Sequence, residues 1–205
     1  MSPRPSVEEQ RREEVLQATL ELITEVGYGR VRVADIAERV GMSTGTIHYY
    51  FDTKEDVLDA AFRFAVAASR RRSEQAIAGI DDPWDRLEAL VDAHLPHADG
   101  RTEWLIWLQL WNEASVRPRL RALNDESYGQ WIERVETIVR DGQERGAFGG
   151  VDAHEFVLRF LTMMDGLVIQ VLMGSAEVDM RHMRDLLLGF ARDGLRPDGP
   201  REPTR

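Results

Sequence analysis

The chain has 205 residues, enough for one or two domains with a substantial core. It contains no cysteine, which excludes disulfide frameworks, thiolate nucleophiles and zinc–thiolate sites and fits a reducing cytoplasm. Its formal net charge is −10, so the molecule as a whole repels nucleic acid and anionic membranes, and any binding to a polyanion must depend on a local patch. The N-terminal segment is charged, and no stretch approaches the ~18 apolar residues of a membrane span, so we expect a cytoplasmic protein with no membrane contact.

Apolar residues recur at helical spacing along almost the whole chain. No stretch shows strand-length alternation between turn signals, so the sequence predicts an all-α protein of about nine helices. We find no internal repeat. The predicted helices cover about residues 6–26, 33–40, 44–51, 52–78, 83–95, 103–115, 118–146 and 152–174, followed by a last helix that holds Met180 to Phe190.

Local signals mark where several of these helices begin. A serine or aspartate three residues before a glutamate is typical of a capping box, because each side chain satisfies an amide that the first turn leaves unpaired. An aspartate followed by proline is also a favourable start. We expect residues 196–205, which hold three prolines, to form a disordered tail. The start signals are Ser6 with Glu9, Asp52 with Glu55, Asp82 with Pro83, and Asp152 with Glu155.

Residues 33–51 carry the most informative pattern in the chain. Two short predicted helices flank Gly41, which permits the positive backbone angle of a tight turn, and Ser43 can cap the second of them. The small side chain of Ala37 lets the two helices approach each other. Apolar residues of both can face inward together, as in a helix–turn–helix: Ile36, Ala37, Val40, Met42, Ile47 and Phe51.

The outward face of the second short helix is unusual for a solvated helix. In a chain with 30% charged residues such a face normally shows Glu, Arg or Lys, whereas this one has no acid. Hydroxyls, a glycine that allows close approach, and rings suit the base edges in a DNA groove. The backbone amides at Ser43 can also hold a phosphate. The residues on this face are Thr44, Gly45, Thr46, His48 and Tyr49.

A longer run that includes this pattern resembles the TetR-type one-component transcriptional regulators. The resemblance implies an N-terminal three-helix domain with a helix–turn–helix that binds DNA, followed by a helical domain that binds a ligand and dimerises. We therefore expect residues 1–52 to form the first domain and residues 53–195 the second. The motif residues lie between Val15 and about Leu58 and are Gly27, Tyr28, Asp35, Ile36, Ala37, Gly41, Ser43, Gly45, Thr46, Tyr49, Tyr50, Phe51, Lys54, Glu55 and Leu58.

By this resemblance, the second short helix enters the major groove of a double-stranded DNA operator. Residues 1–54 hold seven basic and nine acidic residues, so affinity must come from individually placed contacts, with Arg4 and Arg30 as auxiliaries. The expected base contacts are Thr44, Gly45, Thr46 and His48, and the expected backbone contacts are Ser43, Tyr49, Tyr50, Lys54 and Arg32.

The sequence departs from the family pattern at three of these positions. Thr44 and His48 stand where the family often has Lys and Tyr, which reduces phosphate contacts and favours a different base preference. Arg32 stands where the family usually has a Ser or Thr cap, so the first short helix has a weaker start but gains a cation for phosphate.

Aromatic residues gather in the second half of the chain. Three tryptophans at i, i+3 and i+7 share one helix face, and a fourth lies on the next helix. Any one could fill a core, but rings combined with carboxylates suit a cation or amine. The segments WNEA and MMDGL resemble the sensor domains of BetI-type members, whose inducer is choline. We expect a small hydrophobic or amine inducer at Trp104, Trp107, Trp111, Tyr128, Trp131, Met164 and Asp165.

The last two predicted helices carry long apolar faces that could pack within the chain or against a second copy. The resemblance implies the second arrangement, a homodimer on a palindromic operator with half-sites about 34–36 Å apart. Ligand binding would favour a spacing of the recognition helices that does not fit the operator, so we expect a repressor released by its inducer.

A metal site is the main alternative at this stage. His94, His97 and Asp99, with Asp92, offer imidazole and carboxylate ligands, but a helix would have to continue through Pro96 to bring both histidines to one face. The alternative function is therefore a dimeric helical small-molecule or metal-binding protein without DNA activity. The chain has no nucleophile elbow, phosphate loop or His-Glu-x-x-His motif, so we expect no enzyme, cofactor or metal.

Overall fold

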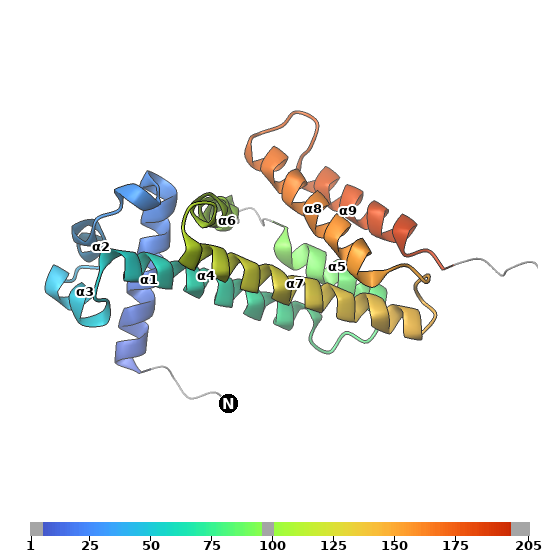
Figure 1. The fold of residues 1–205 in the computed structure, drawn as a ribbon, viewed down its shortest axis with the longest axis horizontal. Coiled ribbons are helices and arrows are strands. Elements are labelled where there is room, and N and C mark those ends of the chain that lie inside the picture. The colour runs from blue at the N-terminus through green and yellow to red at the C-terminus, as the bar shows by residue number, and fades with distance from the viewer. Residues whose placement is uncertain (1–5, 96–100, 198–205) are drawn as a thin grey trace, which may run out of the picture. The chain divides into compact units, whose positions relative to one another are not determined.

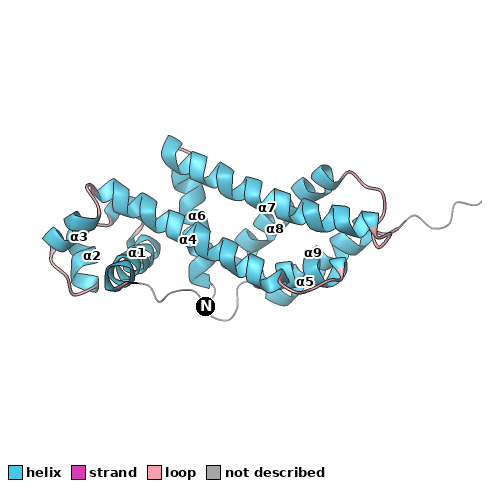
Figure 2. Cartoon of the chain, turned by 90° about the horizontal axis from the view of Figure 1, so that it is seen from below, coloured by secondary structure: helices cyan, strands magenta, loops and turns pink. Residues whose placement is uncertain are grey.

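The computed structural model describes residues 6–95 and 101–197, and every regular element within these ranges is a helix (Figures 1 and 2). The predicted all-α fold is confirmed. No helix in the same ranges is both long and apolar enough to cross a membrane. The elements are α1 (Val7–Val26), the 3₁₀ helix η1 (Tyr28–Arg30), α2 (Val33–Arg39), α3 (Thr44–Tyr50), α4 (Lys54–Ile77), α5 (Pro83–His94), α6 (Arg101–Ala114), α7 (Pro118–Glu144), α8 (Ala153–Leu172) and α9 (Met180–Gly194).

The helix boundaries agree with the sequence prediction to within about two residues. At the start of α1, Ser6 Oγ accepts the N–H of Glu9 at 3.1 Å, and the Glu9 carboxylate accepts the N–H of Ser6 at 2.6 Å. The side chains of Asp82 and Asp152 each accept an amide hydrogen bond from the first turn of α5 and α8. These caps are therefore confirmed, whereas residues 198–205 of the predicted tail lie outside the described part of the chain.

The predicted capping box of Asp52 and Glu55 is wrong. Helix α4 begins at Lys54, and Thr53 Oγ1 accepts the N–H of Asp56 at 3.1 Å and donates to the Asp56 carboxylate at 2.7 Å. The backbone is still extended at Phe51, with φ −143° and ψ 125°, so both following residues are needed to turn the chain into α4. The sequence offers the same capping pattern one residue later, and the turn selects it.

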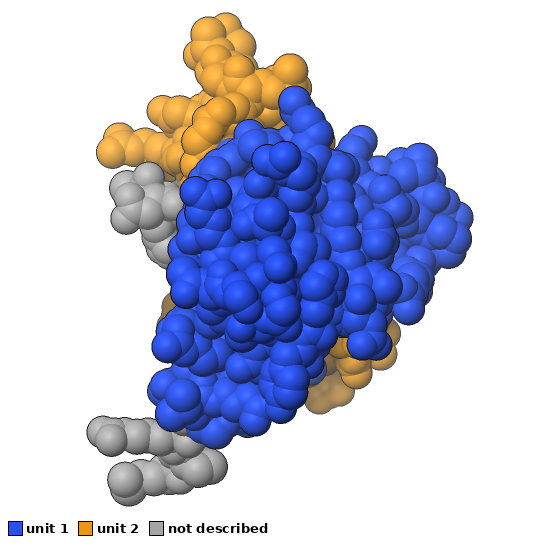
Figure 3. All heavy atoms as spheres, turned by 90° about the vertical axis from the view of Figure 1, so that its left-hand side faces the viewer, with its two compact units in different colours: residues 1–70, 102–125 blue, residues 71–101, 126–205 orange. Residues whose placement is uncertain are grey.

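The described chain divides into two compact units, shown in different colours in Figure 3. Unit 1 comprises residues 1–70 and 102–125, and unit 2 comprises residues 71–101 and 126–205. Helices α4 and α7 contribute residues to both units. Unit 1 thus contains more of the chain than the expected DNA-binding domain of residues 1–52, and that domain boundary stays a prediction.

One hydrophobic core runs through unit 1. Residues of α1, α2, α3 and α4 are buried in it together with Leu110 of α6 and Leu120 of α7. The helix–turn–helix is therefore not a separate layer, because its inner face shares this core. Of the residues predicted to face inward, four are buried and two are partly buried against the core: Ile36, Ala37, Ile47 and Phe51, then Val40 and Met42.

In unit 2, α9 packs against α8 and α5. Phe156 of α8 stacks on Phe160 at 5.9 Å between ring centroids and on Phe190 of α9 at 5.6 Å. At the edge of this packing, Arg184 of α9 donates to the Asp92 carboxylate of α5 at 2.6 Å. The C-terminal helix is thus held by both apolar and charged contacts.

We expect Gly142→Ala to destabilise the protein. A Cβ at Gly142 of α7 would lie 2.1 Å from the ring of Phe148, which packs edge-on against Trp84 with centroids 4.8 Å apart. Overpacking of this kind lowers the free energy of unfolding by about 1–3 kcal/mol, and urea denaturation of the variant would measure this loss. The matched control is Gly129→Ala on the same helix, where nothing lies within 4 Å of the added Cβ and helix propensity gains up to about 1 kcal/mol. Equal stability of the two variants would contradict the described packing of Phe148.

Candidate functional site

Backbone hydrogen bonds close the turn between α2 and α3. The N–H of Gly41 donates to the carbonyl of Glu38 at 3.2 Å, and that of Met42 donates to the carbonyl of Ala37 at 2.9 Å. These two bonds form a Schellman motif. Gly41 has φ 64°, a conformation that a residue with a Cβ adopts only with strain. The predicted role of Gly41 is confirmed, and the turn fixes where α3 begins.

Helix α3 has seven residues and is held by its cap and its inner face. Ser43 Oγ accepts the N–H of Thr46 at 3.0 Å, which confirms the predicted cap, and lies 2.9 Å from Thr46 Oγ1. On the inner face Ile47 is 1% exposed, and Phe51 follows the helix into the core. These contacts determine which residues of α3 remain at the surface.

The surface of α3 consists of hydroxyl groups, an imidazole and a phenol ring. Thr44, Gly45 and His48 are exposed, and Tyr49 is 74% exposed. Thr46 is half-buried, and its hydroxyl is already hydrogen-bonded to Ser43. No acidic residue lies on the helix. A phosphate or base edge that approaches α3 therefore meets hydrogen-bonding groups without a like charge on the helix itself.

Two predicted backbone contacts lie at the C-terminal end of α3 and the start of α4. The ring of Tyr50 is half-buried and meets the ring of Tyr49 edge-on, with centroids 5.2 Å apart. Lys54 Nζ donates to the carbonyl of Gly29 at 2.9 Å, which joins the start of α4 to η1. An ammonium group has three donors, so this bond leaves two for another acceptor.

Arg32 begins α2 without the hydroxyl cap common in this position. Instead the Asp35 carboxylate accepts the Arg32 N–H at 3.2 Å and also binds the guanidinium through Nε at 3.1 Å and Nη2 at 2.8 Å. The hydrogen bond from the Arg32 side chain lowers the pKa of Asp35. The expected weakness of this helix start is thus offset by Asp35, and the Arg32 side chain remains 78% exposed.

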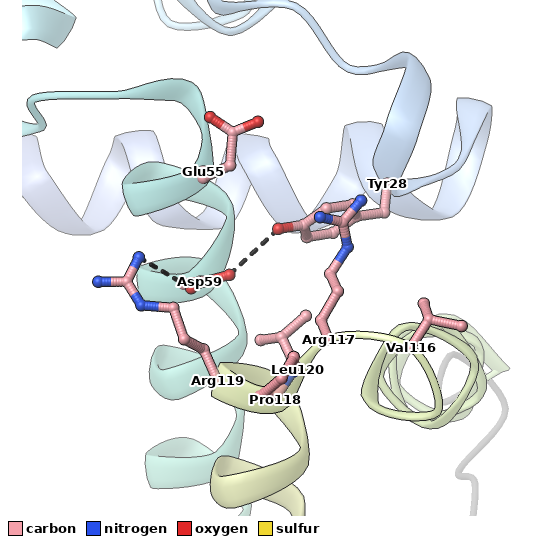
Figure 4. A pocket seen from close by; sticks show the side chains of 8 residues that line it. All are labelled: Tyr28, Glu55, Asp59, Val116, Arg117, Pro118, Arg119 and Leu120. Carbon is pink, nitrogen blue, oxygen red and sulfur yellow. Dashed lines mark hydrogen bonds and ion pairs between the residues drawn. The ribbon is translucent and has the colours of Figure 1, made fainter.

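Unit 1 also contains a cavity of about 300 Å³ that the sequence analysis did not predict (Figure 4). Tyr28 Oη donates to Asp59 at 3.1 Å, and the guanidinium of Arg117 lies 4.6 Å from the centroid of the Tyr28 ring. Arg119 lies 3.5 Å from the Asp56 carboxylate. Burial, followed by the charge of Asp59, raises the pKa of Tyr28. These contacts therefore hold the corner between α6 and α7 against η1 and α4. The presence of Tyr28 in the family motif was the only feature of the sequence that pointed to this cavity.

In unit 2, the structure brings together two of the predicted ligand-binding residues. Tyr128 Oη of α7 donates to the Asp165 carboxylate of α8. Burial raises the pKa of Asp165 to about 6, although the hydrogen bond from Tyr128 opposes this shift. Met164, next to Asp165, is buried. The pair therefore contains a half-buried acid that becomes ionised as the pH rises through about 6.

The predicted tryptophans are divided between the two units. Trp104, Trp107 and Trp111 lie on α6 in unit 1, where Trp107 packs against the core. Trp131 lies on α7 in unit 2 and meets the imidazole of His94 edge-on, with centroids 4.0 Å apart. The single site expected from all seven residues stays a prediction.

His94 is part of the packing of unit 2. Its Nδ1 lies 2.9 Å from the Leu90 carbonyl, and its Nε2 lies 3.3 Å from Ser73 Oγ. Burial lowers the pKa of His94 to about 4, which keeps the ring neutral. His97 and Asp99 lie outside the described residues, and within 6–95 and 101–197 no group of three or more His, Asp and Glu residues could hold a metal ion.

Two families of known proteins match the chain. Residues 15–61 match the family described as "Bacterial regulatory proteins, tetR family", and residues 83–196 match "BetI-type transcriptional repressor, C-terminal". The curated relatives include HTH-type transcriptional regulator BetI 1 of Chromohalobacter salexigens, which is 27% identical over 98% of both chains. HTH-type transcriptional regulator BetI of Stenotrophomonas maltophilia is 29% identical over 92% of this chain and 94% of the relative.

A solved structure is similar over almost the whole length. It is a putative transcriptional regulator from Saccharomonospora viridis in complex with choline, with a TM-score of 0.85 and 36% sequence identity. The match covers 91% of this chain and 97% of that one. A TetR transcription regulator from Haloarcula marismortui has the same fold, with a TM-score of 0.82 at 24% identity.

We expect Asp165→Asn to change how stability depends on pH. The pKa of Asp165 is raised from 3.8 to about 6, so between these pH values the folded chain binds more protons than the unfolded chain, and stability falls as pH rises. Asparagine removes this titration, so the variant gains up to about 3 kcal/mol at pH 7 and shows a flatter profile between pH ~4 and ~6. Urea unfolding across this range measures the effect. The exposed Asp185→Asn is the control, and the same decline in both variants would rule out Asp165 as its cause.

Proposed function

This chain belongs to the tetR family of bacterial regulatory proteins, with a BetI-type C-terminal domain, and we propose on this basis that it is a repressor that binds a palindromic operator as a homodimer and is released by a small amine ligand. Its family and relatives are transcriptional regulators, not enzymes. Each of the three parts of the proposal, namely DNA contact, pairing and ligand release, has its own support in the chain.

The observation that carries the DNA contact is the surface of α3. Its outer side chains are exposed and free of acid in a molecule with a net charge of −10, and its inner side chains are held in the core of unit 1. Such a helix presents a rigid set of donors and acceptors to a major groove. Thr44, Gly45, Thr46 and His48 would meet base edges, and Ser43, Tyr49, Tyr50, Lys54 and Arg32 would meet the phosphate backbone.

Pairing of two chains would supply affinity that one short helix lacks, since two half-sites bind together. In unit 2, two large apolar residues are exposed, Leu158 of α8 and Met173 at its C-terminal cap, the latter 78% exposed. Gly166 of α8 is also exposed, and Gly189 of α9 is half-buried. Small and apolar residues on two neighbouring helices suit a close, self-complementary interface.

The ligand part of the proposal rests on Asp165 and on Tyr128, whose phenol donates to it. A half-buried carboxylate attracts a cation more strongly than an exposed one because less water screens it, and the face of an aromatic ring adds attraction of roughly 0.5–2 kcal/mol. The relative from Saccharomonospora viridis was solved in complex with choline, whose quaternary ammonium fits this chemistry. Ligand binding would favour a spacing of the two recognition helices that does not match the operator.

We expect His48→Ala and Tyr49→Ala to affect DNA binding differently. Operators selected from a random duplex library with the wild-type protein serve as the probe. Tyr49→Ala removes a phosphate contact, so binding weakens by about tenfold for all sequences. His48→Ala removes a base contact, so a preference of about 1–3 kcal/mol disappears at one position of each half-site.

The exposed His182 of unit 2 offers a control, since His182→Ala should leave both affinity and base preference unchanged. Identical selected sequences and affinities for all three variants would contradict the proposed docking of α3. Absence of any sequence selection by the wild-type protein would favour the alternative, a helical ligand-binding protein without DNA activity.

We expect choline to bind more tightly than its neutral isostere 3,3-dimethylbutan-1-ol, as measured by tryptophan fluorescence. The ligand cation stabilises ionised Asp165, so affinity for choline rises with pH through about 6 and that for the neutral alcohol does not. In Asp165→Asn the preference for choline falls by about tenfold or more. Equal binding of choline and the alcohol by the wild-type protein would contradict the proposal of an amine ligand but not the proposal of DNA binding.

A further inference from the structure

Most of the described arginines of unit 1 already have an acid or carbonyl partner within the unit. Six of them bind a carboxylate or backbone carbonyls with at least one nitrogen–oxygen distance of 3.5 Å or less: Arg11, Arg32, Arg39, Arg117, Arg119 and Arg121. A cation that already has an acid partner gains less from a DNA phosphate, because the partner must be displaced or shared. In a chain this acidic, the cations without such a partner are therefore the ones that can bind a phosphate at the lowest cost.

Arg12 is one of these cations. It is exposed on α1, and within the part of the chain that the structure describes no carboxylate or carbonyl lies within bonding distance of its guanidinium. Instead its Cζ lies 5.3 Å from the ring centroid of Phe51. The neighbouring Arg11 differs, since its Nη1 lies 3.3 Å from the Glu14 carboxylate. Two adjacent arginines thus have different partners, one an acid and one an aromatic ring.

The ring of Phe51 places Arg12 at one end of a row of aromatic rings. Tyr49, which is largely exposed on α3, meets Tyr50 edge-on at 5.2 Å between centroids, and Tyr50 lies 6.4 Å from Phe51. Arg12 continues this row from the N-terminal half of α1, and α1 packs against α2 (Figures 1 and 2). The guanidinium is therefore fixed next to the C-terminal end of the helix that we propose enters the groove.

We propose that Arg12 is a phosphate-binding residue of the DNA interface, held in position by the ring of Phe51 and contributed by α1, outside the helix–turn–helix. This inference rests on the proposed DNA binding. A guanidinium that lies over a ring without a hydrogen bond to it keeps its N–H donors for a phosphate, which it can bind through two parallel hydrogen bonds. Because Arg12 lies on α1 and not on α3, it contributes affinity for every sequence and no base preference.

The test measures non-specific binding, so it needs no operator. Wild-type protein and Arg12→Ala bind a duplex of random sequence, labelled with a fluorophore, while the salt concentration is varied. Loss of one phosphate contact lowers the slope of log K against log salt by about 0.9 and weakens binding roughly fifteenfold at about 50 mM salt and about fourfold at about 200 mM. Arg12→Lys keeps the charge and should keep most of the slope.

Two controls separate this effect from a change in net charge. Arg11→Ala alters the adjacent, ion-paired arginine, and Arg63→Ala alters an exposed arginine of α4 that has no described partner. Both should retain the wild-type slope. The melting temperature of each variant shows whether the contact with Phe51 stabilises the fold.

An unchanged slope in Arg12→Ala overturns the inference, and if its melting temperature also falls, the contact with Phe51 is purely structural. An equal loss of slope in Arg63→Ala overturns it as well, because a general charge effect then accounts for the result. Wild-type protein that shows no salt-dependent binding contradicts the proposed function itself, a result distinct from a failure confined to Arg12.

Discussion

The proposed DNA contact depends on how the seven residues of α3 are held. A helix this short is not stable alone in water, since nucleation costs more than so few hydrogen bonds return. Ile47 and Phe51 bury its inner side in the core of unit 1, and Ser43 and the Gly41 turn fix its start. The outward face is whatever this anchoring leaves exposed. Its chemistry can therefore be specialised for recognition without a cost to the core.

Charge is the second constraint. With a net charge of −10, this protein and DNA repel each other at long range, so affinity has to come from short-range contacts in fixed positions. The structure pairs five arginines of unit 1 with acids, so fewer cations remain for phosphate. Lys54 donates a hydrogen bond to the carbonyl of Gly29, and Arg12 lies over the ring of Phe51. Neither contact involves a carboxylate. Such placement reduces the entropy that a mobile side chain would lose on binding.

Asp165 illustrates how a proposed ligand-binding residue can reduce stability. Burial raises its pKa to about 6, which means that the ionised form is disfavoured in the folded chain. The hydrogen bond from Tyr128 recovers part of this penalty. A cationic ligand would offset the remaining cost of ionising Asp165 in the folded chain. Ligand binding would then stabilise the conformation that holds the ionised carboxylate next to the cation.

The sequence by itself determined the helices, most of their caps and the turn at Gly41, because these features depend on residues three to five positions apart and on backbone hydrogen bonds between them. It also indicated which side chains of α3 face outward, since helical spacing defines the faces of a helix. The cap of α4 was missed by one residue, Thr53 in place of Asp52, because the turn from Phe51 uses two residues before the helix can begin.

Only the tertiary structure decided which distant groups meet. Tyr28 and Asp59 are 31 positions apart, and Tyr128 and Asp165 are 37 apart. The ring of Phe51 lies beneath Arg12 rather than Arg11, although the two arginines are adjacent in the chain. Such pairs are set by how helices pack around a shared core. No local pattern encodes that packing, because each helix contributes only one side of every contact.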